Sequence, residues 1–179
     1  PSAAVAWRLS EEPFMENVTW LDDLKLRASY GFTGNQEIGT YRSQPLLNDL
    51  TYILGNDVVV SGYYPASVGN SELRWEKSEQ WDVGLDAAFL GNRFNFAVDV
   101  YRKLTDDLLW NIPLPRETGF GNALMNVGSI ENKGVEASLR AQVLSSVDGP
   151  TWYTSFNNAG NRNEVLDLGP NEEIYGGDI

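Results

Sequence analysis

Apolar and polar residues alternate strictly along much of this sequence. In residues 135–143, VEASLRAQV, every odd position is apolar and every even position is polar or charged. A repeat of two places successive side chains on opposite faces of a β-strand, whereas a helix repeats about every 3.6 residues. The sequence therefore predicts strands with one apolar and one polar face, and it contains no convincing helical pattern.

Six segments show this alternation, although it weakens at Asn158 and Gly160 in the last one. Several are about 9–11 residues long, the length of a tilted membrane-spanning strand, whereas strands of globular domains average about 5–6 residues. The predicted strands are residues 3–9, 24–33, 79–90, 93–104, 133–143 and 151–160. The predicted fold class is all-β, an antiparallel meander of about six long strands that forms part of a transmembrane β-barrel.

The connections between these strands alternate between short and long. Gly91-Asn92 suits a two-residue type II′ hairpin turn, and residues 144–150 form another short link. The long connections, which we expect to be outer loops, are residues 34–78, 105–132 and 161–179. Short turns at one end and long loops at the other are typical of outer-membrane barrels.

The hairpin around Gly91-Asn92 places the apolar residues of its two strands on one face and sets Arg102 opposite Trp81, where we expect the guanidinium to lie over the indole. We expect the polar faces to line a water-filled lumen with Lys25, Arg27, Asp82, Asp86, Asp99, Glu136 and Arg140. The aromatic residues expected to form lipid-facing girdles are Trp7, Tyr30, Phe32, Trp81, Phe89, Phe94 and Trp152.

The composition argues against several classes of function. The net charge of −12 argues against a nucleic-acid partner, because no basic patch exists to displace phosphate counterions. The absence of His and Cys removes the commonest general base, the commonest zinc ligand and any thiolate site. The sequence shows no signal peptide and no apolar run long enough for a transmembrane helix. We expect no cofactor and no metal.

Two acidic groups invite a chemical interpretation. Asp82, Asp86 and Asp99 could pair as the carboxylates of a glycoside hydrolase, but their place along a strand wall favours lumen lining over an enzyme. The acidic segment 171–179 could bind calcium, but it lacks the spacing of a known calcium loop.

Aromatic residues also occur in the predicted loops. Tyr41, Trp110 and Phe120 could contact a substrate or a lid protein. They could instead pack within their own loops, which is the interpretation that the length of the loops favours, because loops of this length need a small core. The sequence leaves both interpretations open.

Four collinear stretches, residues 7–41, 73–109, 113–139 and 152–169, closely resemble the SusC/RagA-type TonB-dependent outer-membrane transporters. The motifs GNQEIG, LRWE and NVGSIENKGVE carry this resemblance as a set. It implies a barrel of about 22 strands closed by an N-terminal plug, in the outer membrane of a Gram-negative bacterium. This chain would be a slice of the C-terminal barrel, with the plug, the TonB-contacting segment and the last strand outside it.

The resemblance also implies partners. These are outer-membrane lipid, a SusD-like surface lipoprotein that covers the pore, TonB acting through the plug, and a glycan or peptide substrate. The alternative to this import function is a soluble β-sandwich module that binds carbohydrate. The two hypotheses differ in what the apolar face meets, which is lipid in a barrel and a second sheet in a sandwich.

Overall fold

The computed structural model of the chain describes residues 1–35, 38–55, 58–145 and 149–169. Strands predominate in these residues, with short 3-10 helices at Leu9–Glu11, Pro13–Met15 and Arg116–Thr118. None of the helices in this described part is long and apolar enough to span a membrane. The chain divides into two compact units, one of residues 1–33, 78–104 and 130–165 and one of the described residues in 34–77, 105–129 and 166–169.

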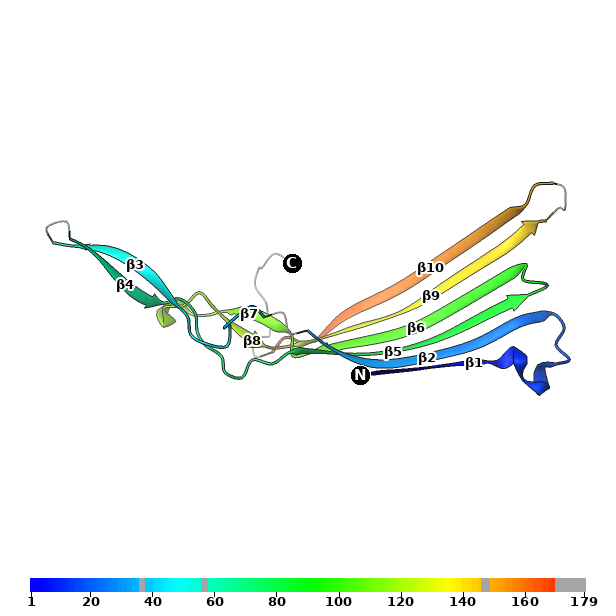
Figure 1. Cartoon of the computed structure of the whole chain (residues 1–179), viewed down its shortest axis with the longest axis horizontal. Helices are drawn as coiled ribbons and strands as arrows, with labels where there is room; N and C mark the ends of the chain where they lie inside the picture. Colours follow the sequence, from blue (N-terminus) through cyan, green and yellow to red (C-terminus); the bar gives the residue numbers. More distant parts are fainter. Residues whose placement is uncertain (36–37, 56–57, 146–148, 170–179) are drawn as a thin grey trace. The chain divides into compact units, whose positions relative to one another are not determined.

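The first unit is a six-stranded sheet with the strand order β1-β2-β5-β6-β9-β10 (Figure 1). Its strands are Ser2–Arg8 (β1), Leu21–Asn35 (β2), Glu76–Phe89 (β5), Phe94–Asp106 (β6), Ser129–Leu144 (β9) and Trp152–Asp167 (β10). Neighbours in the sheet follow one another along the chain, apart from the long connections after β2 and β6. The predicted all-β meander of six strands is confirmed.

Pairing between β1 and β2 assigns side chains to faces. Trp7 pairs with Leu26, whereas Arg27 pairs with Ala6. Residues that lie opposite each other on antiparallel strands share a face. The sheet therefore has an apolar face that carries Trp7 and Leu26, and a polar face that carries Arg27.

The apolar face is uncovered. Side chains on it that are between 37% and 66% exposed include Val5, Leu26, Val83, Val100, Val135 and Leu139. Within the described residues of the sheet, the buried hydrophobic side chains are only Ala87 and Ala88. A sheet packed against a second sheet would instead bury one whole face in a core.

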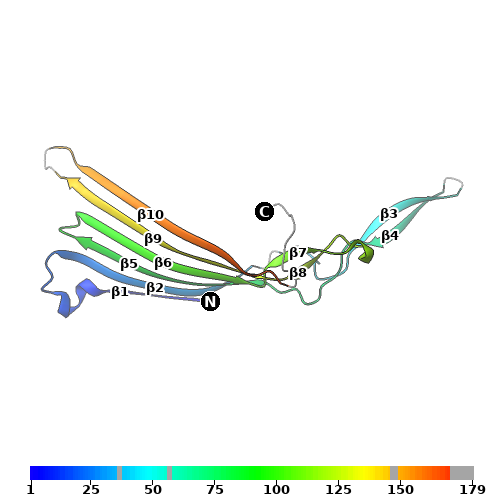
Figure 2. The ribbon, with the colours of Figure 1, turned by 180° about the vertical axis from the view of Figure 1, so that it is seen from behind.

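The short connections lie at one end of the sheet. β1, β5 and β9 end where β2, β6 and β10 begin, so the long connections leave from the opposite strand ends (Figure 2). This alternation agrees with the predicted asymmetry between short turns and long loops. That the long connections are outer loops stays a prediction.

The turn between β5 and β6 differs from its prediction. Residues 90–93 lie outside the strands, and φ is 55° at Leu90, 69° at Gly91 and 60° at Asn92. The predicted type II′ turn is wrong, because that turn requires a negative φ at its second central residue, Asn92. Two hydrogen bonds to residues around the start of β2 hold the turn in this conformation. The Leu90 N–H donates to the Trp20 carbonyl at 3.0 Å, and the Asn92 N–H donates to Asp22 Oδ2 at 2.9 Å.

The second unit contains two hairpins within segments that the sequence analysis assigned to loops. Leu47–Leu54 (β3) pairs with Val58–Pro65 (β4), and Leu109–Pro113 (β7) pairs with Asn122–Asn126 (β8). The last wall strand also differs, since β10 continues to Asp167 through residues expected to begin a loop. Backbone pairing sustains this strand where its apolar alternation weakens.

Two of the quoted motifs contact each other in this unit. Asn126 Oδ1 accepts the Arg74 N–H at 2.7 Å, and Asn126 Nδ2 donates to the carbonyls of Arg74 and Asp107, each at 2.8 Å. Glu76 Oε1 accepts the Leu109 N–H at 3.0 Å. The Asn126 amide thus uses both its N–H donors and its oxygen. LRWE and the start of NVGSIENKGVE are therefore joined to each other and to residues 107–109 within this unit.

The two faces predict opposite tolerance to charge. In the full-length protein, we expect Val83→Arg to lower the free energy of unfolding from lipid vesicles by about 2–4 kcal/mol, because it places a cation against hydrocarbon. The matched control Asp82→Arg places the same side chain on the polar face and should change this free energy by about 1 kcal/mol or less. Denaturant titration of the protein folded in vesicles measures both. Equal effects would contradict the assignment of the apolar face to lipid.

Candidate functional site

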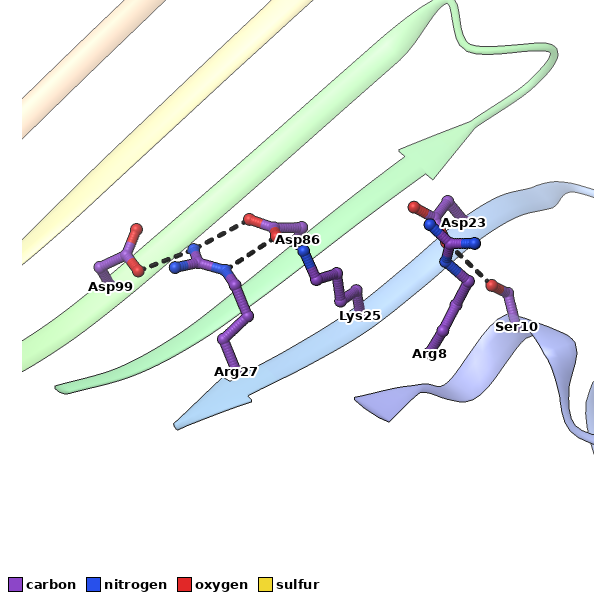
Figure 3. Close-up of polar contacts among 7 residues, drawn as sticks. All are labelled: Arg8, Ser10, Asp23, Lys25, Arg27, Asp86 and Asp99. Atoms are coloured by element: carbon purple, nitrogen blue, oxygen red, sulfur yellow. Dashed lines mark hydrogen bonds and ion pairs between the residues drawn. The ribbon is translucent and has the colours of Figure 1, made fainter. Parts of the chain in front are cut away.

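An ion-pair cluster spans three strands on the polar face. Arg27 on β2 donates from Nε to Asp86 Oδ2 at 2.8 Å and from Nη2 to Asp86 Oδ1 at 3.0 Å (Figure 3). The same Nη2 donates to Asp99 Oδ1 on β6 at 2.8 Å. The three side chains are each about a third exposed, at 29–35%. A bidentate guanidinium contact of this kind fixes orientation as well as charge.

Gly84 makes this cluster possible. Arg27 lies on β2 and Asp99 on β6, so the guanidinium must cross β5, which lies between them. A Cβ at position 84 would lie 2.6 Å from Arg27 Nη2 and would also meet the Asp99 carboxylate. Because glycine lacks that atom, Arg27 can lie flat across β5 and join three strands.

Other charged groups extend the polar face along β1 and β2. Lys25 Nζ lies 3.9 Å from Asp86 Oδ2. Nearer the start of β2, Asp23 Oδ1 lies 3.4 Å from Arg8 Nε and accepts a hydrogen bond from Ser10 Oγ at 3.0 Å (Figure 3). Positive and negative groups alternate here, so this part of the face carries charge without a large excess of either sign.

The remaining wall residues from the sequence analysis lie apart from this cluster. Glu136 and Arg140 are exposed on β9, and no ion pair joins them in the part of the chain that the structure describes. The Arg140 guanidinium instead lies 4.7 Å from the centre of the Tyr153 ring on β10. Asp82 is half-buried and shares the face of Asp86 by strand alternation. That these residues line a lumen stays a prediction.

An open hollow of about 550 Å³ lies on the polar face and extends from β2 to β10. Its lining combines charge, amides and hydroxyls with small side chains. The polar lining residues are Asp23, Asp86, Asn95, Ser138, Arg140, Tyr153, Ser155 and Asn157. These groups can donate and accept hydrogen bonds, so the face suits a hydrated or polar neighbour rather than lipid.

The seven predicted girdle residues lie on the apolar face by strand pairing and alternation. Two of them have polar ends that bond to carboxylates: Tyr30 Oη donates to Glu79 Oε1 at 2.7 Å, and Trp7 Nε1 donates to Glu12 Oε1 at 2.8 Å. Such residues, with an apolar body and a polar tip, suit a boundary between hydrocarbon and water. Contact with lipid stays a prediction for the set Trp7, Tyr30, Phe32, Trp81, Phe89, Phe94 and Trp152.

Arg102 does not have the partner that the sequence analysis expected. Its Nε donates to Glu131 Oε1 at 2.5 Å, and the other carboxylate oxygen of Glu131 contacts Lys133 Nζ. In the described residues, the guanidinium that lies over an aromatic ring is that of Arg140, and the ring is that of Tyr153. The stacking of Arg102 on Trp81 is therefore wrong, because a full carboxylate charge attracts a guanidinium more strongly than a ring quadrupole does.

The loop aromatics do not form a cluster. Tyr41 is 67% exposed, Trp110 lies on β7 and is 38% exposed, and Phe120 is half-buried. No ring contact joins these three among the residues that the structure describes. Their role in substrate or lid contact stays a prediction.

Sequence reasoning missed the hairpin of β3 and β4. Pairing gives it a largely apolar face made of Leu50, Tyr52, Leu54, Val58, Val60 and Tyr64, whereas the opposite face mixes apolar residues with Asp49, Thr51 and Ser61. Most of these side chains are exposed, Tyr52 and Tyr64 included. The signal was present, because Gly55 and the residues after it separate two short β-rich segments, LNDLTYIL and VVVSGYYP.

No group of three or more acidic side chains in the described ranges is arranged to hold a metal ion. The acidic segment 171–179, considered above for calcium, lies outside the described residues.

Comparison with known proteins gives a consistent result. The sequence matches the family described as TonB dependent receptor-like, beta-barrel, over residues 1–173. It is 44% identical over 168 residues to TonB-dependent receptor P39 of Formosa agariphila, covering 94% of this chain and 16% of that protein. It is 38% identical over 187 residues to TonB-dependent receptor SusC of Bacteroides thetaiotaomicron, covering 98% of this chain and 18% of that protein.

The fold has a close match among solved structures. A chain of the RagAB peptide transporter superposes with a TM-score of 0.80 at 36% identity, covering 94% of this chain and 18% of that chain. The RagAB peptide importer in its open-open state gives a TM-score of 0.78. The chain thus spans between 16% and 18% of the length of these relatives.

The crossing of Arg27 over Gly84 predicts a coupled pair of mutations. In the full-length protein, we expect Gly84→Ala to displace the guanidinium and lower the free energy of unfolding by about 1–2 kcal/mol. In an Arg27→Ala background the same change should cost less, because Arg27 is gone and the Asp99 carboxylate, which no longer bonds to it, can rotate away from the added Cβ. Denaturant titration of the four proteins of the cycle measures the coupling.

Gly160→Ala is the matched control for this cycle, since a Cβ at that strand position meets no atom within 4 Å. It should leave the free energy of unfolding nearly unchanged in both backgrounds. Strict additivity of Gly84→Ala and Arg27→Ala would show that Gly84 does not serve the cluster.

Proposed function

The chain belongs to the family of TonB-dependent receptor-like β-barrels, and we propose from this that its sheet is part of the wall of an outer-membrane nutrient importer. The six strands and their outer loops would form one section of that barrel. The loops would comprise residues 34–78, 105–132 and 161–179, apart from those that belong to the six strands. The full-length protein would lie in the outer membrane of a Gram-negative bacterium.

The observation that carries the proposal is the exposed apolar face of long strands. Five of the six strands have 13 to 16 residues, enough for a tilted crossing of about 9–11 residues with extensions beyond it. The side chains along the middle of the apolar face are uncovered, whereas the other face carries ion pairs and amides. Lipid outside and water inside suit these two faces.

The alternative of a soluble carbohydrate-binding sandwich is not favoured. A sandwich needs a second sheet over the apolar face, and the two hairpins in the described residues are short, with two strands each. The family match extends over residues 1–173, so it includes the strands and most of the loops.

The names of the relatives and the chemistry of the polar face support a proposal for the substrate class. A solved relative is named as a peptide importer, and SusC is named as a TonB-dependent receptor. We infer that this protein imports glycan oligomers or peptides, because the charges, amides and hydroxyls of the polar face allow either to pass in hydrated form. We infer a transport role for the chain and no enzymatic one.

We further propose two protein partners. A SusD-like surface lipoprotein would cover the pore, and the apolar face of the β3–β4 hairpin is a candidate contact for it, together with Tyr41, Trp110 and Phe120. An isolated two-stranded hairpin is marginally stable in water, so an exposed apolar face on one favours a partner. TonB would supply energy through a plug segment elsewhere in the full-length protein.

Uptake tests the function directly. Cells that carry the full-length gene, cells that lack it and complemented cells receive labelled oligopeptides or labelled oligosaccharides. We expect gene-dependent uptake of one class, and its loss when a protonophore removes the energy that TonB transmits. Uptake that is the same in all three strains for both classes, with the protein present in the outer membrane, would count against import.

The lid contact has its own test. The double variant Leu54→Asp and Val58→Asp places two charges at a cross-strand pair on the apolar face of the hairpin. We expect it to reduce the lipoprotein that copurifies with the full-length protein by at least about tenfold, which corresponds to roughly 1.4 kcal/mol. Thr51→Asp on the opposite face of the hairpin is the control and should retain the lipoprotein. Equal retention by both proteins would exclude this face as the contact.

A further inference from the structure

A charged cluster lies on the apolar face of the sheet, where the proposed function places lipid. Arg102 on β6 follows Val98 and Val100 in the alternation of that face, and Lys133 on β9 precedes Val135. Both cations contact Glu131, which also lies on this face of β9. A cluster of charges that continues a row of valines requires an explanation.

The carboxylate of the cluster is buried and the cations are not. The side chain of Glu131 is 6% exposed, whereas those of Arg102 and Lys133 are 40% and 45% exposed. One buried negative charge therefore holds two cations in place and leaves one positive charge in excess. The Arg102 bond to Glu131 uses Nε, and a guanidinium and an ammonium carry further N–H donors for an anion.

The cluster borders an apolar hollow of about 440 Å³. The hollow crosses from β5 to β10, and most of its lining is apolar. The side chains of the apolar face that line it include Trp81, Val100, Arg102, Lys133, Val135 and Arg162. Arg162 adds a third cation that is 70% exposed and lies 3.1 Å from Glu164. Apolar walls beside exposed cations match a ligand with an acyl chain and an anionic group.

The position of these residues along the strands also suits a ligand with an acyl chain and an anionic group. Arg102 lies near the end of β6, Lys133 near the start of β9 and Trp81 near the start of β5, which is the end from which the long connections leave. In a barrel, long loops are external, so this end meets the outer leaflet at its headgroups. Basic residues at that depth attract anionic lipid headgroups. The chain as a whole has a net charge of −12, so a local excess of positive charge is unusual for it.

We propose that Arg102, Lys133 and Arg162 bind the phosphate of a phosphorylated lipid of the outer leaflet, with an acyl chain of that lipid lying in the hollow beside Trp81. Glu131 is a positioning residue, because it orients two of the cations without facing the ligand. The inference rests on the proposed function, since it needs the apolar face to contact lipid.

Lipid retention tests the inference on the full-length protein. The protein is purified in detergent, incubated with lipid A, which carries phosphate groups, and analysed by native mass spectrometry. Phosphatidylcholine serves as the zwitterionic comparison, and inorganic phosphate is added as a competitor. We expect lipid A to be retained in preference to phosphatidylcholine and millimolar phosphate to displace little of it, because free phosphate lacks the acyl chain.

Charge-removing variants give the decisive comparison. Arg102→Gln with Lys133→Gln should reduce retained lipid A at least fivefold. Arg162→Gln should reduce it at least twofold, and we expect this variant to fold because the Arg162 side chain is 70% exposed. Arg93→Gln, in the turn that precedes the opposite end of β6, is the control and should retain lipid A as the unmodified protein does. Unchanged retention of lipid A in Arg162→Gln, and in the double variant if it folds, would overturn the inference. Equal retention of lipid A and phosphatidylcholine by the unmodified protein would also overturn it.

The two proposals fail in different ways. A full-length protein that does not insert into lipid vesicles would remove the barrel function and this site together. If the protein inserts and imports its substrate, but removal of these cations leaves lipid A retention unchanged, the proposed function is retained and only the lipid site is excluded.

Discussion

Each strand of the six-stranded sheet must pair its backbone with a neighbour in one register, because a shift of one residue exchanges the two faces. The register of β1 and β2 sets Trp7 beside Leu26 and keeps Arg27 on the other side. In a bilayer this constraint becomes strict, since backbone groups have no water to bond and every strand needs a neighbour on both sides. The separation of an exposed apolar face from a face of ion pairs depends on such a register between every pair of neighbouring strands.

On the polar face, ion pairs between strands fix the charged side chains without a hydrophobic core around them. Arg27 bridges β2, β5 and β6 through Asp86 and Asp99. It can do so only because Gly84 has no side chain on β5 in the path of the guanidinium. A similar relation occurs on β9, where a Cβ on Gly134 would lie 2.6 Å from the Tyr101 hydroxyl of β6. Strand glycines here give room to long side chains from neighbouring strands, which then join the strands laterally.

The strand alternation predicted most of the sheet because it depends only on neighbouring residues. The six segments, their two faces and the grouping of Lys25, Arg27, Asp86 and Asp99 on one face could all be read from a period of two. The turn at Leu90 could not, because contacts with Trp20 and Asp22 set its backbone.

The partner of Arg102 was also beyond sequence reasoning. Counting from an assumed turn placed Arg102 against Trp81, but Glu131 on β9 is the group that it reaches. The end of β10 was missed for a related reason. Strand pairing is a backbone interaction, so residues 161–167 continue the strand without an apolar pattern.

By itself, the sequence determined that this chain is an all-β wall with an apolar and a polar face, and its motifs indicated the family. Those properties are local, since each residue's face follows from its parity along a strand. Only the tertiary structure decided which charges meet, that Arg27 passes over Gly84, and that Glu131 gathers Arg102 and Lys133 on the apolar face. Such contacts join residues of different strands, and the neighbours and register that bring them together are properties of the assembled sheet.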